Sequence, residues 1–146
     1  MNGRPGPEAR SAFVHFCEIT TRWMDNDAYR HVNNVVYYSF FDTAVNRHLI
    51  EQGLLDIENS PAVGLVVENQ CRYFNSLAFP DKVTVGIRVS HIGTSSIKYE
   101  LGIFRNDENL ESAHGNFVHV YVDRESNSPV PLPPPVRAAV AALQAR

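Results

Sequence analysis

Residues 35–52 limit the possible folds of this chain more than any other segment, because they predict a long helix that is apolar on most of its sides. An apolar stripe recurs at the three- and four-residue spacing of a helix with one buried face: Tyr37, Phe40, Phe41, Ala44, Val45, His48 and Leu49. Further apolar residues widen this stripe beyond one side: Val35, Val36, Tyr38 and Ile50. Gly53 provides the expected stop at the C-terminal end. We expect other elements to wrap around such a helix.

The remaining segments predict mainly β-strands. Strand-forming residues fill 12–22, and apolar side chains alternate through 65–74, 83–89, 97–103 and 117–122. In 65–74, the alternation places Leu65, Val67, Asn69, Cys71 and Tyr73 on one face. Residues 106–109 predict a turn, 129–135 an extended proline-rich tail and 136–143 a short terminal helix. One long helix packed on one antiparallel sheet is an α+β arrangement.

Length and composition fit a single globular domain. The 146 residues are 44% hydrophobic and 20% charged, close to the averages of globular proteins. Residues 1–10 are polar and rich in proline and glycine, so we expect a disordered leader there. The domain is expected to span 11–146, with its core in 11–123 and the tail and short helix in 129–146. Cys17 and Cys71 lie far apart, which favours free thiols over a disulfide.

Charge and hydropathy argue against several classes of partner. The formal net charge is −3 and the sequence has no basic surplus, so nucleic acid is not an expected partner. No apolar run approaches the roughly 18 residues of a transmembrane helix, and no apolar stretch of the signal-peptide type occurs near residue 1. We therefore expect a cytoplasmic protein without a membrane partner.

A cluster of polar residues lies directly before the long predicted helix. Residues 25–34 read Asp-Asn-Asp-Ala-Tyr-Arg-His-Val-Asn-Asn and combine carboxylates, amides and an imidazole. Asn33 or Asn34 can cap the helix, because an amide oxygen there accepts an otherwise unpaired backbone N–H. The N-terminus of a helix also presents free N–H groups and the positive end of its dipole. The cluster therefore predicts a functional site at this helix terminus.

The same residues resemble a known family. Asp25-x-Asp27-x-x-Arg30-His31-Val32-Asn33-Asn34-x-x-Tyr37 is similar to the signature D-x-D-x-x-G-H-V-N-N-x-x-Y of the 4-hydroxybenzoyl-CoA thioesterase-like branch of the hotdog-fold superfamily. Residues 91–96 resemble the H-x-G-x-S-S turn of that branch, and 72–74 followed by Pro80-Asp81 is a third match. The resemblance covers about 11–123. It implies a hotdog fold, in which a five-stranded antiparallel sheet wraps around one long central helix. It also implies a homodimer, often paired into a homotetramer, with active sites at the subunit interface.

The resemblance assigns chemistry to two residues. Asp27 is the implied catalytic carboxylate, acting as nucleophile or general base, and the backbone N–H of Asn34 is the implied oxyanion donor. One such donor typically lowers the barrier by about 3 kcal/mol. The implied reaction needs no metal or cofactor, since CoA is part of the substrate. Arg30 replaces the glycine of the signature. Either the loop runs differently, or Arg30 tolerates the backbone conformation of glycine and brings a guanidinium suited to a CoA phosphate.

Six residues are candidates for substrate binding: Arg30, His31, Asn33, Tyr37, Thr94 and Ser95. Most of them also have an ordinary structural interpretation. His31 is favoured as a hydrogen-bonded anchor of the loop, Asn33 as a cap and Tyr37 as part of the packed core. Thr94 and Ser95 are expected to line the acyl or pantetheine channel, or to form a simple turn.

The two aspartates of the cluster have alternatives as well. Asp25 is favoured as an acceptor that stabilises the loop over a second catalytic group. Asp27 alone would be interpreted as a turn aspartate, and the complete signature favours catalysis. Asp27 and His31 have a spacing that suits a metal, but no third ligand is indicated, so no metal site is expected.

The primary functional hypothesis is hydrolysis of acyl-CoA or related acyl thioesters. A second hypothesis is hydration or dehydration of an acyl thioester on the same fold, although the D-x-N-P-x-H loop of such enzymes is absent. A third is a non-catalytic acyl-CoA binding protein.

Overall fold

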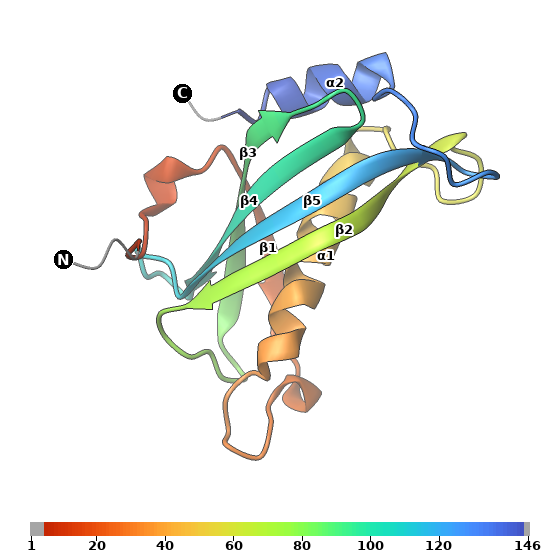
Figure 1. Cartoon of the computed structure of the whole chain (residues 1–146). Helices are drawn as coiled ribbons and strands as arrows, with labels where there is room; N and C mark the ends of the chain where they lie inside the picture. Colours follow the sequence, from red (N-terminus) through yellow and green to blue (C-terminus); the bar gives the residue numbers. More distant parts are fainter. Residues whose placement is uncertain (1–4, 145–146) are drawn as a thin grey trace.

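The structure is a computed structural model that describes residues 5–144. The main elements are β1 (His15–Thr20), α1 (Asn34–Glu51), β2 (Ala62–Tyr73), β3 (Lys82–Ile92), β4 (Ser96–Arg105), β5 (Ala113–Asp123) and α2 (Pro134–Ala141). Two short 3₁₀ helices, η1 (Arg10–Ala12) and η2 (Trp23–Asp25), flank β1. The strands form one antiparallel sheet in the order β1-β3-β4-β5-β2, and α1 lies against one face of it (Figure 1). The predicted α+β class is confirmed.

Helix α1 packs on the sheet through the stripe that its sequence predicts. Its buried residues are Tyr37, Phe40, Phe41, Ala44, Val45 and Leu49. On β5, Gly115 gives the Phe41 ring room to approach, because a Cβ at that position would overlap the ring. Val35 and Ile50 remain 63% and 46% exposed. Val36 and Tyr38, by contrast, pack against the core, so the sheet and its central helix have the arrangement that the sequence predicts.

Both ends of α1 have the predicted stop signals. At the N-terminus, the Asn33 side-chain oxygen accepts a hydrogen bond from the Val35 N–H at 3.1 Å. At the C-terminus, Gly53 takes a left-handed φ of +71°. The Leu54 N–H then donates to the Leu49 carbonyl at 2.8 Å, and the Gly53 N–H donates to the Ile50 carbonyl at 2.9 Å. This is the hydrogen-bond pattern of a Schellman motif, which satisfies the last carbonyls of a helix.

Strand β2 departs from the predicted alternation. A bulge between Val66 and Glu68 shifts its register against β5, so Val66 pairs with His119 and Glu68 with Val118. One extra residue moves all following side chains to the opposite face. The prediction that Leu65, Val67 and Asn69 share a face is therefore wrong.

The two ends of the chain pack against the sheet. The Glu8 N–H donates to Glu111 at 2.8 Å, and the Arg10 N–H donates to the Asn109 carbonyl at 3.0 Å. The predicted disordered leader is therefore wrong for residues 8–10, while residues 1–4 lie outside the described part. Helix α2 covers one end of the core with Val136 and Val140 (Figure 1).

Two further properties concern the whole described chain. Cys17 and Cys71 are free cysteines, as the sequence favours. Among residues 5–144, neither helix combines the length and hydrophobicity that crossing a membrane would require.

Candidate active site

The loop between η2 and α1 is a tight hairpin around Asp27. The Asp27 N–H donates to the His31 carbonyl at 2.9 Å, and the Arg30 N–H donates to the Asp27 carbonyl at 3.0 Å. This pattern is that of a three-residue hairpin loop, whose last residue adopts a left-handed conformation and is commonly glycine. Here that residue is Arg30, with a φ of +68°. The arginine therefore takes the backbone conformation that suits glycine, which agrees with the backbone part of the second alternative for Arg30.

Asp25 and Asn26 hold this hairpin on the body of the protein. Asp25 is 2% exposed, and its carboxylate accepts the Arg22 N–H at 2.7 Å and pairs with the Arg22 guanidinium at 2.8 Å. The Asp25 carbonyl accepts the Asn33 N–H at 2.8 Å. The Asn26 side chain accepts the Phe79 N–H at 3.0 Å. Asp25 is thus an acceptor that stabilises the loop, as favoured from the sequence.

Asp27 and Asn34 border the same cavity, which we call the helix hollow. It has a volume of about 390 Å³ and is lined by Asp27, His31, Val32, Asn34, Tyr37, Tyr73, Phe74, Asn75 and Ser76. One Asp27 oxygen accepts the Tyr29 N–H at 2.8 Å, and its other oxygen has no partner among residues 5–144. The Asn34 N–H, the first of α1, likewise has no acceptor in the described chain. A residue with a free carboxylate oxygen and a residue with a free helix N–H therefore line one hollow.

Tyr37 and Tyr73 form the aromatic wall of the helix hollow. Their rings meet edge to face with centroids 4.9 Å apart, and the Tyr73 hydroxyl donates to the Asn34 carbonyl at 3.1 Å. Burial raises the pKa of Tyr37 to about 12, so this phenol stays protonated at neutral pH. Tyr37 is both packed core and cavity wall, so its two predicted roles do not exclude each other.

Asp27 also lines a second cavity, which we call the loop hollow. It has a volume of about 350 Å³ and is lined by Trp23, Asn26, Asp27 and Arg30. Trp23 is 79% exposed and contacts Phe79 edge to face at 6.0 Å. Asp27 is the one residue that lines both hollows.

Comparison with known proteins identifies the family. The model of the thioesterase-like superfamily matches residues 21–140, which include the hairpin and both hollows. The chain belongs to the thioesterase-like superfamily. Its fold is the hotdog fold of these thioesterases, as the resemblance of the sequence implies.

Individual relatives resemble this thioesterase-like chain over most of its length. The solved PA5185 protein of Pseudomonas aeruginosa PAO1 is 50% identical, with a TM-score of 0.94 over 96% of this chain and 98% of that one. A thioesterase from Thermus thermophilus, solved with coenzyme A and Zn, is 30% identical, with a TM-score of 0.76 over 92% and 98%. The YsmA protein of Bacillus subtilis is 26% identical over 130 residues, 86% of this chain and 84% of that protein.

Within this thioesterase-like fold, the remaining predicted site residues differ in position, and His31 is one that lines the helix hollow. The His31 side chain is exposed and makes no hydrogen bond within residues 5–144, so His31 anchors the hairpin through its backbone carbonyl alone. Thr94 and Ser95 lie on the β3–β4 turn and line neither hollow. Their carbonyls accept the Leu132 and Tyr121 N–H groups at 2.9 and 2.7 Å. In one chain they pack against the C-terminal segment and β5, away from Asp27.

Sequence reasoning missed one residue from a distant segment, Tyr73, and one beside the motif, Trp23. Tyr73 is 39 positions from Asn34, and the periodicity of β2 gives no sign that its last residue reaches the helix terminus. Trp23 lies two residues before Asp25, the first residue of the family signature, and has no counterpart in that signature. The available signal was that Trp23 is the single tryptophan of the chain and lies directly before the polar cluster.

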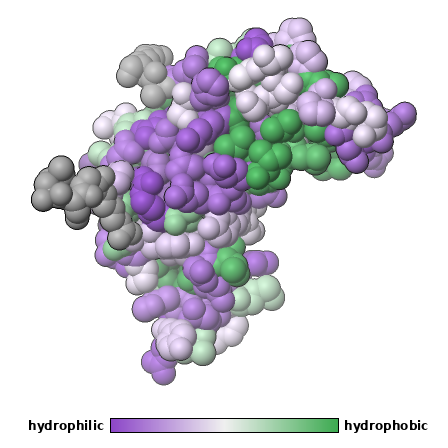
Figure 2. Space-filling model, viewed as in Figure 1, coloured by the Kyte–Doolittle hydropathy of each residue, from purple (hydrophilic) through white to green (hydrophobic). Residues whose placement is uncertain are grey.

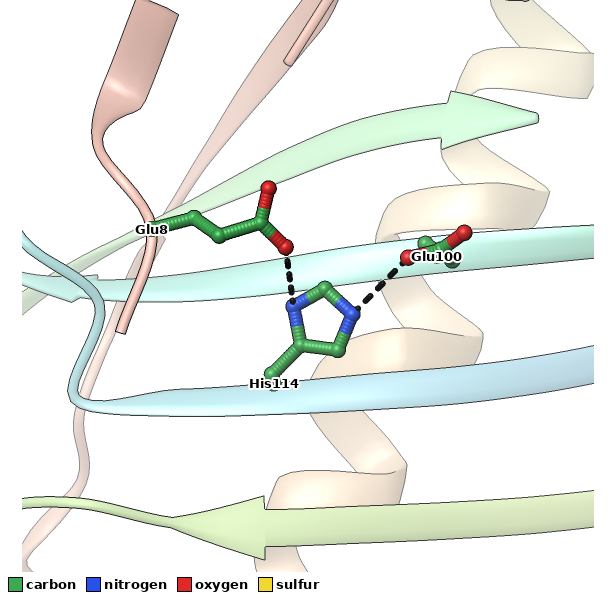
Figure 3. Close-up of side chains that lie close together, drawn as sticks. All are labelled: Glu8, Glu100 and His114. Carbon is green, nitrogen blue, oxygen red and sulfur yellow. Dashed lines mark hydrogen bonds and ion pairs between the residues drawn. The ribbon is translucent and has the colours of Figure 1, made fainter. Parts of the chain in front are cut away.

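A separate cluster of charged groups lies on the face of the sheet opposite α1. Figure 3 shows Glu8 from the N-terminal segment, Glu100 from β4 and His114 from β5 pointing toward one another. Their ligand atoms lie within 4.8 Å of each other, a donor set that suits a metal. Arg88, however, pairs with Glu8 at 2.8 Å and with Glu100 at 2.7 Å, so a cationic side chain already binds both carboxylates. We therefore assign the cluster a structural role.

His114 is the centre of this cluster. Its Nδ1 lies 2.6 Å from the buried Glu111 carboxylate and its Nε2 lies 3.0 Å from Glu100. Burial by itself lowers the pKa of His114, but the hydrogen bonds and charges of Glu100 and Glu111 outweigh it and raise the pKa to about 9. The hydrogen bond with His114 in turn lowers the pKa of Glu100 to about 2, although burial opposes this. The cluster holds the N-terminal segment on the sheet.

Proposed function

We propose that this protein hydrolyses acyl-CoA thioesters, with Asp27 as the reacting carboxylate and the Asn34 N–H as the oxyanion donor. One observation carries this proposal: Asp27, with a carboxylate oxygen that has no partner in the described chain, and Asn34, with a free helix N–H, line the same hollow. The thioesterase from Thermus thermophilus that was solved with coenzyme A supports CoA as the thiol carrier.

The geometry suits acyl transfer. As negative charge develops on the thioester oxygen, the Asn34 N–H and the positive end of the α1 dipole stabilise it. Asp27 either attacks the carbonyl carbon, forming a mixed anhydride as the C–S bond breaks and the thiolate leaves, or removes a proton from an attacking water. In the first route a water then hydrolyses the anhydride and regenerates the carboxylate. Rapid-quench mass spectrometry of the Asp27 peptide distinguishes the routes, because only the first leaves the acyl group on the enzyme.

Asp27→Asn tests the assignment. The amide keeps the size of the side chain and its bond to the Tyr29 N–H but lacks the basicity of a carboxylate. We expect kcat for thiol release from acyl-CoA to fall by at least about 100-fold, with an unchanged melting temperature. Asp42→Asn, on the exposed side of α1, is the matched control and should keep wild-type turnover. A folded Asp27→Asn protein with near-normal turnover would rule out this role.

The same assay separates the other hypotheses. A hydratase changes the mass of an enoyl-CoA by one water without releasing thiol. A non-catalytic binding protein shows saturable acyl-CoA binding in calorimetry and releases no thiol. An Ellman-type screen over chain lengths and aryl-CoA esters then defines the acyl preference.

We further infer that two copies of the chain pair along β2. This strand of 12 residues is an edge of the sheet, and its Leu65, Val66 and Val67 are 44%, 43% and 60% exposed. Figure 2 shows hydrophobic residues gathered over the part of the sheet nearest α2. Long apolar edge strands are normally paired or covered. In such a dimer, Thr94 and Ser95 remain candidates for the acyl or pantetheine channel, now across the interface.

Val67→Lys tests the pairing. A charge at the most exposed apolar position of the edge should shift the protein toward a monomer in light scattering after size exclusion, and lower thioester turnover. Lys98→Gln, an exposed change on β4, serves as the control for a surface substitution. A wild-type protein that is monomeric at micromolar concentration contradicts the inference.

A further inference from the structure

Arg30 has a backbone conformation that is unfavourable for its residue type. Three non-glycine residues of the described chain have a positive φ, namely Arg30, Asn106 and Asn127. Asparagine tolerates the left-handed region because its short side-chain amide can form local hydrogen bonds. Arginine has no such compensation, so this backbone conformation destabilises the folded state at Arg30 by about 1 kcal/mol. An unfavourable residue at the edge of a candidate site is a reason to look for a role of its side chain.

The Arg30 guanidinium is also free to bind a ligand. Its side chain is exposed, and within residues 5–144 it forms no ion pair or hydrogen bond. The neighbouring Arg22 is already paired with the buried Asp25. The formal net charge of the chain is −3, so the protein as a whole does not attract an anion. A polyanionic substrate therefore needs a local cation at the site, and Arg30 provides one beside Asp27.

The two hollows that meet at Asp27 differ in chemistry. The helix hollow has the walls of Tyr37, Tyr73 and Phe74, which suit an apolar or aromatic acyl group. The loop hollow has the Arg30 guanidinium and the exposed indole of Trp23, which suit an anion and a planar ring. In a thioester whose carbonyl carbon lies at Asp27, the acyl group and the thiol carrier extend from that carbon in different directions.

We propose that the acyl half of the substrate occupies the helix hollow and the thiol half runs through the loop hollow, where Arg30 binds a phosphate of the thiol carrier. This proposal rests on the proposed thioester hydrolysis at Asp27. A guanidinium binds the oxygens of a carboxylate as well as those of a phosphate. The carboxylate at the far end of a dicarboxylic acyl group is therefore a second possible source of the anion that Arg30 binds. The tests below separate these two sources.

The first test compares Arg30→Gln on two thioesters of the same acid, one with CoA and one with N-acetylcysteamine, which lacks phosphate. We expect the ratio of kcat/KM for the CoA ester over the N-acetylcysteamine ester to fall at least tenfold, mainly through KM. Arg47→Gln, an exposed arginine near the other end of α1, is the matched control and should keep the wild-type ratio. An unchanged ratio in Arg30→Gln, including an equal loss on both esters, overturns the proposal.

A third substrate identifies the source of the anion. If Arg30→Gln slows only the N-acetylcysteamine ester of a dicarboxylic acid, and leaves the neutral acyl-CoA unaffected, Arg30 reads the acyl half and the proposal is wrong. If Arg30→Gln slows hydrolysis of the neutral acyl-CoA and leaves hydrolysis of both N-acetylcysteamine esters at the wild-type rate, the phosphate assignment holds.

A binding measurement makes the inference testable without turnover. Trp23 is the single tryptophan of the chain, so its fluorescence reports directly on the loop hollow. We expect free CoA to change this fluorescence saturably, pantetheine to bind at least tenfold more weakly, and Arg30→Gln to raise the Kd of CoA at least tenfold. If wild-type protein releases no thiol but shows this pattern, the proposed hydrolysis fails while the role of Arg30 stands. Equal binding of CoA and pantetheine overturns that role.

Discussion

The ion pairs of His114 predict that the protein loses stability as the pH rises from about 6.5 to 9. In the folded protein, Glu100 and Glu111 hold the pKa of His114 at about 9, whereas an unfolded histidine titrates near 6.5. The folded state therefore binds the proton more tightly. This contribution is fully present below pH 6.5 and is lost as the pH rises through 9. The shift corresponds to roughly 3 kcal/mol of folding stability.

His114→Gln isolates this contribution, because all other titrating groups are shared with the wild type. We expect the difference in unfolding free energy between the two proteins to be about 3 kcal/mol larger at pH 6 than at pH 9. Urea denaturation followed by far-ultraviolet circular dichroism at both pH values measures it. A difference that does not change with pH would refute the reasoning.

Two further measurements protect the test against a variant that does not fold. The imidazole signals of the wild-type protein, followed by NMR between pH 6 and 10, give the pKa of His114 directly, and a value at or below 6.5 would refute the reasoning as well. Glu100→Gln removes the negative charge of one of the two carboxylates that hydrogen-bond to the imidazole. It should lower the pKa of His114 and move the loss of stability to lower pH.

Three substitutions test other parts of the structure by urea denaturation. Gly115→Ala should destabilise the protein by about 1–3 kcal/mol, because the new methyl group overlaps the buried Phe41 ring, and an unchanged midpoint would show that the helix can move away. Asn33→Ala should lower the unfolding free energy by about 1 kcal/mol, because the capping hydrogen bond to the Val35 N–H is lost. An unchanged unfolding free energy would mean that water replaces this hydrogen bond. Arg30→Gly should stabilise the protein by about 1 kcal/mol by relieving the left-handed backbone, and a destabilised variant would contradict the assignment of strain.

The local features of the site could be predicted from the sequence. The spacing of apolar residues gives helix α1 to within one residue at each end, since the observed helix spans Asn34–Glu51. Asn33 and Gly53 are stop signals because each acts on backbone groups a few positions away. The hairpin around Asp27 is likewise closed by hydrogen bonds within five residues, so its conformation depends on local contacts.

Other features depend on contacts between segments that are far apart in the chain. Tyr73 reaches Asn34 only because β2 runs along the sheet to the N-terminal end of α1. The bulge in β2 changes the face of half its residues, and a pattern of period two cannot reveal an inserted residue in advance. Glu8 becomes ordered because Glu111 and Arg88, more than 75 positions away, offer it partners.

The sequence by itself therefore determined the helix, its caps and the polar loop that carries Asp27, because these follow from periodicity and short-range hydrogen bonds. Only the tertiary structure decided which residues surround Asp27 and which do not. It brought Tyr73 and Phe74 to the helix hollow and carried Thr94 and Ser95 away from it. The physical reason is that cavity walls are made by packing of distant elements, whose relative positions depend on the register and length of every strand between them.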